Sequence, residues 1–333
     1  MKRRLLYGLY AMFVLFSLLL TAACGKSSDQ RSADGQGREV RDTWNRTVRI
    51  AKKPERILTL AIYTDEIALG LVPTGKLVAI NRFHDDPKES VIVEKARKIP
   101  EKVGIPTAEQ IVAWKPDVVF ATPWTSPEEI AVMEDLKIPV VVCGPSNSYE
   151  DVQANIRLMA AGLWEEERGE KIIAAMDDVK REIAAKLTEI PERERKSVVL
   201  LSVMTTYGGA ESAFDDMCKY AGVVNGIAEI GLKNGQILTK ELLVKIDPDI
   251  MLMPSYDDQG TFDTQKFIDG YLNDPALQSM KAIQEQSLFY PREGYIYNGS
   301  QDIVFGIQEI AFCAYGDAFR QEDNRHISFS GEN

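Results

Sequence analysis

The chain has 333 residues, of which 45% are hydrophobic and 27% are charged, so its length suits about two globular domains. Its 39 basic and 50 acidic residues give a formal net charge of −11, which argues against nucleic acid as a partner, because binding it requires a basic face. There are only two histidines, and no H-E-x-x-H pair, nucleophile elbow or phosphate-binding glycine loop occurs. These absences predict that the protein is not an enzyme.

The first 23 residues have the pattern of an export signal. Lys2, Arg3 and Arg4 precede an apolar run over residues 5–20, and small residues then lead to Cys24. A retained membrane anchor is the competing interpretation, but the run is at the short end for spanning a bilayer. The stretch from Thr21 to Cys24 resembles a bacterial lipobox, which implies that Cys24 carries a lipid and that the mature protein is anchored to the cell membrane on its extracytoplasmic face, in the periplasm or on the outer surface of the plasma membrane.

A tether is expected after the signal. Residues 24–41 contain almost no apolar side chains to offset the entropy of ordering them, so we expect them to be disordered. The other cysteines, Cys143, Cys218 and Cys313, lie in apolar surroundings and none belongs to a CxxC pair. We expect buried free thiols there, and neither a disulfide nor a metal site.

Residues 42–147 alternate between apolar strands and short amphipathic helices, which predicts an N-terminal α/β lobe with a mainly parallel sheet. The predicted strands are residues 56–61, 77–80, 118–121 and 140–142. One predicted helix begins near Thr64 and ends at Gly70, and two more cover residues 107–115 and 127–136.

A long helical region, residues 148–191, follows the first lobe. Ser148 is a plausible N-cap, Gly162 a plausible C-cap of a first piece, and Pro191 stops a second piece of helical period. A helix of that length can connect two lobes, although a surface helix within one domain has the same periodicity.

Residues 192–333 repeat the α/β pattern and predict a C-terminal lobe. The tail after Arg320 is polar, and we expect it to be frayed. The predicted strands are residues 197–203, 250–253 and 288–290, and the predicted helices cover residues 213–221, 267–271 and 302–319. The fold class predicted from the pattern is therefore two Rossmann-like lobes joined by a long linking helix.

One stretch of the first lobe recurs in the second. Thr107, Glu109 and Asp117 are matched by Thr239, Glu241 and Asp249 at the same spacing, with a proline before each aspartate. Threonine can cap a short helix, and glutamate in the first turn interacts favourably with the helix dipole. Seven residues beyond the two aspartates stand Trp124 and Tyr256, which we expect just past the carboxyl ends of equivalent strands, where ligands bind in open α/β sheets.

The chain resembles the substrate-binding lipoproteins of bacterial ATP-driven (ABC) importers, in the class that carries ferric siderophores, haem and cobalamin. The resemblance covers nearly everything from Arg41 to Phe319. Its most specific residues are Pro54-Glu55-Arg56-Ile57-Leu58, Glu66 with Leu69-Gly70, and Glu109-x-Ile-x-x-x-Lys-Pro-Asp117.

This resemblance implies a rigid pair of lobes with a ligand cleft between them and little hinge motion. It implies a monomer without a cofactor, whose partners are an ABC permease, its ATPase and a metal-chelate ligand. It further implies that Glu109 and Glu241 dock onto arginines of the permease, although both glutamates could instead only stabilise the starts of their helices.

Two rival interpretations remain. Chelatase-like or nitrogenase-like enzymes that handle a tetrapyrrole or a metal have similar lobes, but they are cytoplasmic, which the export signal disfavours. A lipoprotein that senses or sequesters a ligand without a transporter would have the same sequence features.

The candidate ligand contacts are the aromatic, basic and polar residues that follow the predicted strands. Aromatic faces suit a large ring-bearing ligand, and arginine recognises carboxylates or an anionic iron complex. We therefore place a ferric siderophore first, cobalamin second and haem third, with His84 or a tyrosine as a possible axial ligand for haem. The candidates are Tyr63, Asn81, Arg82, Phe83, His84, Trp124, Tyr207, Tyr256, Arg292, Tyr295 and Tyr297.

Overall fold

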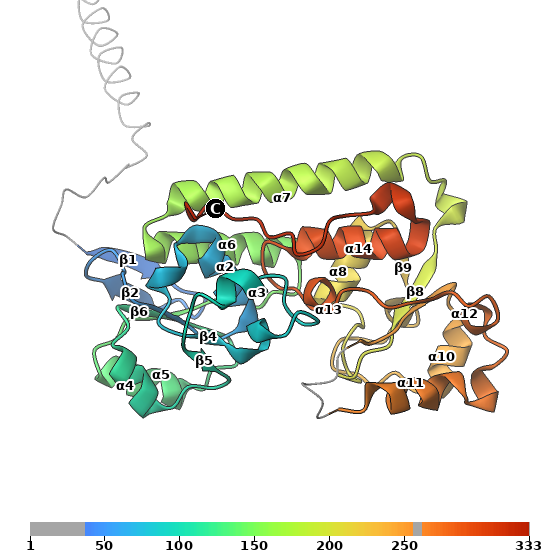
Figure 1. Cartoon of the computed structure of the whole chain (residues 1–333), viewed down its shortest axis with the longest axis horizontal. Helices are drawn as coiled ribbons and strands as arrows, with labels where there is room; N and C mark the ends of the chain where they lie inside the picture. Colours follow the sequence, from blue (N-terminus) through green and yellow to red (C-terminus); the bar gives the residue numbers. More distant parts are fainter. Residues whose placement is uncertain (1–36, 256–261, 333) are drawn as a thin grey trace, which may run out of the picture. The chain divides into compact units, whose positions relative to one another are not determined.

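Two separate parallel sheets organise the computed structural model, which describes residues 37–255 and 262–332 (Figure 1). In the N-terminal lobe the strand order is β3-β6-β7, and β4 pairs with β5 beside them. Leu58, Val119 and Val141 are fully buried in the central strands, so helices must cover both faces of this sheet. The strands are β3 (Ile57–Thr59), β4 (Ile80–Asn81), β5 (Lys102–Val103), β6 (Val118–Ala121) and β7 (Val140–Val142).

The C-terminal lobe has the strand order β11-β10-β8-β9, again all parallel. The central pair β8 and β10 has Val198 opposite Ile250, much as β3 and β6 have Ile57 opposite Val118. The two lobes are therefore built on the same central pair of strands, and the predicted fold class is confirmed. The strands are β8 (Ser197–Leu200), β9 (Val224–Asn225), β10 (Ile250–Leu252) and β11 (Leu288–Phe289).

Short helices connect these strands. In the N-terminal lobe they are α2 (Ile62–Leu71), η1 (Thr74–Lys76), η2 (Arg82–Asp85), α3 (Val93–Ala96), α4 (Ala108–Trp114) and α5 (Pro127–Asp135). In the C-terminal lobe they are α8 (Ala213–Tyr220), α9 (Gly226–Glu229), α10 (Lys240–Ile246), α11 (Thr264–Leu272), η4 (Pro275–Leu277), α12 (Lys281–Gln284), α13 (Glu293–Ile296), α14 (Ile303–Tyr315) and η5 (Asp317–Phe319).

The linking region is a pair of helices, α6 (Tyr149–Leu163) and α7 (Glu166–Leu187), with η3 (Glu192–Glu194) after them. The predicted N-cap is confirmed, because the Ser148 hydroxyl accepts from the backbone N–H of Asp151 at 3.1 Å. The predicted C-cap at Gly162 is wrong. Trp164 takes the left-handed conformation that ends α6, with φ 61°, and Gly162 lies inside the helix, where a Cβ would stand 3.0 Å from the ring of Phe120.

Helix α7 connects the two lobes. At its start, the guanidinium of Arg168 donates to the carbonyl of Leu71 in the N-terminal lobe at 2.9 Å. At its end, Lys186 donates to the carbonyl of Ala318 in the C-terminal lobe at 2.8 Å. Figure 1 shows α7 running alongside α6 and α14, and this packing is what the predicted amphipathic face provides.

The predicted tether is wrong at its carboxyl end. Residues Arg38–Arg41 form β1, which pairs antiparallel with β2 (Thr47–Ile50). The reason is Val40, whose buried side chain lies opposite Val48 and anchors an otherwise polar strand. Residues 1–36, including the signal and Cys24, lie outside the described residues.

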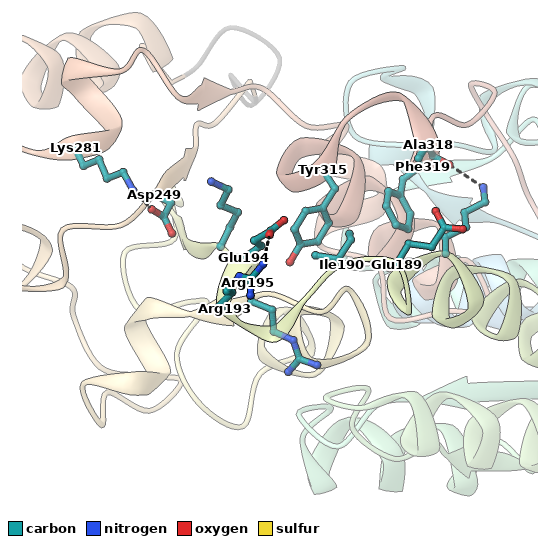
Figure 2. A pocket seen from close by; sticks show the side chains of 12 residues that line it. Glu189, Ile190, Arg193, Glu194, Arg195, Asp249, Lys281, Tyr315, Ala318 and Phe319 are labelled. Carbon is teal, nitrogen blue, oxygen red and sulfur yellow. Dashed lines mark hydrogen bonds and ion pairs between the residues drawn. The ribbon is translucent and has the colours of Figure 1, made fainter.

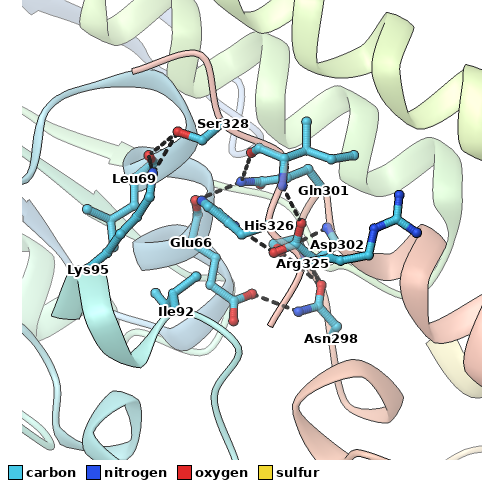
Figure 3. A network of polar contacts seen from close by, with 12 residues as sticks. Glu66, Leu69, Ile92, Lys95, Asn298, Gln301, Asp302, Arg325, His326 and Ser328 are labelled. Carbon is cyan, nitrogen blue, oxygen red and sulfur yellow. Dashed lines mark hydrogen bonds and ion pairs between the residues drawn. The ribbon is translucent and has the colours of Figure 1, made fainter. Parts of the chain in front are cut away.

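The polar tail after Arg320 does not fray, which contradicts the sequence-based expectation. Asp302 accepts from the backbone N–H of Ile327 at 2.9 Å and lies 2.6 Å from Nδ1 of His326 (Figure 3). The Ser328 hydroxyl then donates to the carbonyl of Leu69, on α2 of the N-terminal lobe, at 3.1 Å. The tail is therefore a second connection between the lobes, held mainly by hydrogen bonds that an apolar pattern does not reveal.

Gln301 joins three segments in this network. It is fully buried, and its side-chain amide donates to the carbonyl of Glu66 at 2.8 Å and to the carbonyl of Ile327 at 3.1 Å. One side chain thus connects α2, the turn before α14 and the tail.

Cys143, Cys218 and Cys313 are free and buried, as predicted. None of the helices in the described residues has the length and the apolar character that crossing a membrane requires.

We expect Gln301→Ala to lower the free energy of unfolding by about 2–3 kcal/mol, because two buried carbonyls lose their donor and a cavity is left. Gln278→Ala is the matched control, since the exposed Gln278 amide also donates to two backbone carbonyls and water can replace it. Urea unfolding of both variants measures the difference. Equal effects would contradict the structural role of the buried network.

Candidate functional site

A cavity of about 210 Å³ lies between the two lobes, at the carboxyl ends of their strands. The segments that follow β3 and β4 form its N-terminal side, and the segments that follow β8 and β11 form its C-terminal side. This is the position at which open α/β sheets bind ligands. The lining residues are Ile62, Glu66, Phe83, Glu89, Val203, Met204, Glu293, Gly294, Tyr297 and Asn298.

Three of the described lining residues are glutamates, and none of these described residues is basic. Glu66 is almost fully buried and accepts from the side-chain amide of Asn298 at 2.9 Å. Burial raises the pKa of Glu66 to about 7, with Asp302 adding to the rise and His84 opposing it. Glu293 accepts from the backbone N–H of Ser255 at 2.5 Å.

The apolar part of the lining is aromatic and sulfur-bearing. Tyr297 donates its hydroxyl proton to Ser202 at 2.8 Å, and its ring centre lies 5.0 Å from that of Tyr207. Met204 is half-exposed at the cavity, with 51% of its surface accessible, and Phe83 lines the opposite side. This combination can contact the face or edge of a ring system, with hydrogen-bond acceptors close by.

The structure places His84 and Tyr295 away from the cavity. Nδ1 of the fully buried His84 lies 2.9 Å from the Ser90 hydroxyl, and its Nε2 lies 3.2 Å from Asp65. Burial would lower the pKa of His84, but the neighbouring Asp65 carboxylate outweighs it and the pKa is raised. Tyr295 is also fully buried, and its hydroxyl donates to the carbonyl of Arg325. Both residues stabilise the protein interior, and neither lines the cavity.

The two predicted arginines do not line the cavity either. Arg292 is paired with Glu309 at 2.5 Å and with Asp323 at 2.6 Å, and these carboxylates outweigh the effect of burial and raise its pKa. Arg82 is exposed, with its guanidinium carbon 5.5 Å from the ring centre of Phe83. The prediction that arginines face an anionic ligand therefore lacks support in this cavity.

Trp124 and Tyr63 are close together at the end of β6. Their ring centres are 6.0 Å apart, and the Tyr63 hydroxyl donates to the carbonyl of Gly144 at 3.0 Å. Trp124 is 67% exposed and lines a second cavity of about 460 Å³ between α4 and α5. Asn81 caps η2 by accepting from the backbone N–H of Phe83. Tyr256 lies outside the described residues.

An open depression of about 640 Å³ lies at the end of α7 (Figure 2). Lys196 and Asp249, which precede β8 and β10, line it, so it stands at the amino ends of the strands. Two of its cations are already engaged, because Lys281 is paired with Asp249 and Lys186 donates to a backbone carbonyl. We therefore do not assign the ligand site to this depression.

Sequence reasoning missed Glu66, Glu293 and Asn298 as site residues. For Glu66 a signal was present, since it lies within α2, which is otherwise mostly apolar and buried along nearly its whole length. A carboxylate in such a helix is costly unless it has a function or a partner. Glu293 and Asn298 follow β11 in a segment where no periodic pattern distinguishes them.

Glu109 and Glu241 occupy the same place in the two lobes. Each lies in the first turn of its helix, α4 or α10, after a threonine whose hydroxyl accepts a backbone N–H at 3.3 Å. The pKa of Glu109 is lowered by its own backbone N–H and by Thr107, and that of Glu241 by Thr239 and then by its own backbone N–H. Both carboxylates are exposed and remain ionised at neutral pH.

The comparisons with known proteins agree with this geometry. The sequence profile of the family described as "Periplasmic binding protein" matches residues 57–293. The "Uncharacterized ABC transporter substrate-binding lipoprotein YvrC" of Bacillus subtilis is 23% identical over 96% of this chain and 100% of that protein. A "Vitamin B12-binding protein" of Vibrio parahaemolyticus is 30% identical, over 41% of this chain and 47% of that protein.

A solved structure of the molybdate-binding protein MolA from Haemophilus influenzae has the same fold. It superposes with a TM-score of 0.68 at 19% identity, covering 85% of this chain and 92% of that one.

The raised pKa of Glu66 makes stability depend on pH. Its pKa rises from the ordinary 4.5 to about 7, so the folded protein binds the proton more tightly. The contribution of Glu66 to stability is fully present below about pH 4.5 and is lost as the pH rises through about 7, in total about 3 kcal/mol. Denaturant unfolding between pH 4 and pH 8 should therefore show the free energy of unfolding falling as the pH rises. In Glu66→Gln this fall should be smaller by about 3 kcal/mol. Equal pH slopes in the two proteins would contradict this account of Glu66.

Proposed function

Because this chain belongs to the periplasmic binding protein family, we propose that it captures a neutral or cationic metal chelate, with cobalamin as the first candidate, and delivers it to a membrane permease. The chain is the substrate-binding component of an ABC transporter, and it is a binding protein, not an enzyme. Such a component acts outside the cytoplasm and works with a permease and an ATPase.

The lining of the cavity supports a ligand without net negative charge. Among the described residues that line it, three are glutamates and none is basic, so an anionic complex would find no cation to pair with in a partly desolvated site. Glu66 is only partly ionised at neutral pH, because its pKa is raised to about 7. This lining places cobalamin ahead of the ferric siderophore, which the sequence analysis placed first because of two arginines. Haem, with its propionates, is disfavoured for the same reason.

Cobalamin fits the chemistry of the lining better. Its corrin ring carries amide side chains, whose N–H groups can donate to Glu66 and Glu293, while Asn298 can both donate and accept. Tyr297 and Met204 supply apolar contacts for the ring. A cavity of about 210 Å³ holds only part of so large a ligand, so the remainder would extend beyond its mouth.

Fluorescence titration of the chain from Gly37 onward tests the ligand class. We expect saturable binding of cyanocobalamin and much weaker binding of an anionic ferric catecholate, haemin and molybdate. Glu293→Gln should weaken cyanocobalamin binding about tenfold, because a hydrogen bond to a charged acceptor is replaced by a weaker one to a neutral amide oxygen. Glu129→Gln, in the second cavity, is the matched control and should leave the affinity unchanged. Tight binding of the ferric catecholate without a response to cyanocobalamin would overturn the proposal.

Membrane attachment is the second part of the proposal. The small residues that lead to Cys24 after an apolar run support cleavage before Cys24 and its modification with lipid. Stable anchoring takes at least two lipid chains, because a single chain binds a membrane only marginally.

We therefore expect Cys24→Ala to release the protein from the membrane fraction. Mass spectrometry of the mature N-terminus measures the modification directly. An unmodified Cys24, or a first residue elsewhere, would refute the lipid anchor.

Docking is the third part. Glu109 and Glu241 are exposed, ionised and equivalently placed in the two lobes, which supports their pairing with basic residues of the permease. We propose that the protein acts there as a monomer, with one glutamate from each lobe.

A further inference from the structure

Each of these glutamates stands between two exposed apolar side chains. Ile105 and Val112 flank Glu109 and are 87% and 46% exposed. Ile237 and Val244 flank Glu241 at the same spacing and are 60% and 37% exposed. We call Ile105, Glu109 and Val112 the N patch, and Ile237, Glu241 and Val244 the C patch.

The fold does not explain these apolar residues. Helices α4 and α10 pack on the core through Ile111 and Leu243, which are 6% and 0% exposed. The exposed residues of the two patches are therefore not needed for that packing. A single exposed isoleucine on a surface is ordinary. Its recurrence on the same side of the same glutamate in both lobes is a pattern that packing within the monomer does not require.

Neighbouring positions in the two segments have diverged. Exposed Ala113 corresponds to exposed Lys245, and Ala108 corresponds to Lys240. If duplication alone had preserved the segment, the surface positions would be equally free to change. The exposed apolar residues and the glutamate are instead identical in both segments. The threonine caps and the aspartates Asp117 and Asp249 are also identical, but these have structural roles at the ends of helices and strands.

We infer that the exposed apolar side chains of the N patch and the C patch are part of the contact with the permease, and that the permease offers an apolar depression beside each basic side chain that pairs with Glu109 or Glu241. This inference rests on the proposed function and adds the apolar half of the contact. The negative charge of the patch selects the basic side chain, and the exposed isoleucine supplies buried apolar area that the charge pair lacks.

The test measures the affinity of the chain from Gly37 onward for the cognate permease–ATPase complex in nanodiscs, by interferometry. Ile105→Ser and Ile237→Ser should each weaken binding about tenfold, because one buried isoleucine side chain is lost. The double variant should be weaker than either, and Ile105→Val with Ile237→Val should restore most of the affinity. Phe329→Ser, which removes an exposed apolar side chain of the tail, is the matched control and should have no effect.

Glu109→Ala and Glu241→Ala are measured beside them, together with cyanocobalamin binding and thermal unfolding. We expect both glutamate variants to weaken docking, to reduce its dependence on salt, and to leave ligand binding intact. If the glutamate variants weaken docking and the serine variants do not, the apolar contact is wrong and the proposed docking by Glu109 and Glu241 stands. If neither set weakens docking, the proposed docking is wrong as well. Loss of binding to permease-free phosphatidylglycerol vesicles in the serine variants would overturn the inference in favour of a lipid surface.

Discussion

The buried contact between α2 and the turn before α14 is the interaction on which the arrangement of the lobes depends. Asn298 and Gln301 of the C-terminal lobe both donate to Glu66 of the N-terminal lobe, one to its carboxylate and one to its carbonyl. Buried polar groups of this kind are costly unless every partner is in place, so they favour one relative position of the two lobes. The same carboxylate lines the cavity, which makes the floor of the ligand site part of the contact between the lobes.

Two further connections reinforce that contact. Helix α7 runs from the N-terminal lobe to the C-terminal lobe, and the tail returns from the C-terminal lobe to α2 through Ser328. Together these three connections oppose the opening of a hinge between the lobes. We infer that ligand capture involves little change in the angle between the lobes, as the family resemblance implies, and that specificity depends on the chemistry of the lining.

The sequence predicted the core elements well because their signals are local. The strands at Val118–Ala121 and Val140–Val142 are bounded as predicted, and Thr107 and Ser148 cap their helices as predicted. The tail was mispredicted because its order comes from hydrogen bonds with distant partners such as Asp302, and composition does not encode these.

The site was harder to predict than the fold. Chain position correctly indicated that segments following the strands face a cavity, and Phe83 and Tyr297 do line it. It could not indicate which way each side chain points. Arg292 turns to Glu309 and Asp323, which are distant in sequence. Glu66 had a signal in the sequence, a carboxylate within a mostly apolar helix, but its contact with Asn298 of the other lobe is visible only in the folded protein.

A crystal structure of the protein grown with cyanocobalamin tests the central claim most directly. The account predicts the ligand between the lobes, with the corrin against Tyr297 and Met204 and an amide within hydrogen-bond distance of Glu66 or Glu293. Cyanocobalamin seated in the cavity between α4 and α5, or an anionic chelate bound between the lobes beside the three glutamates, would contradict it.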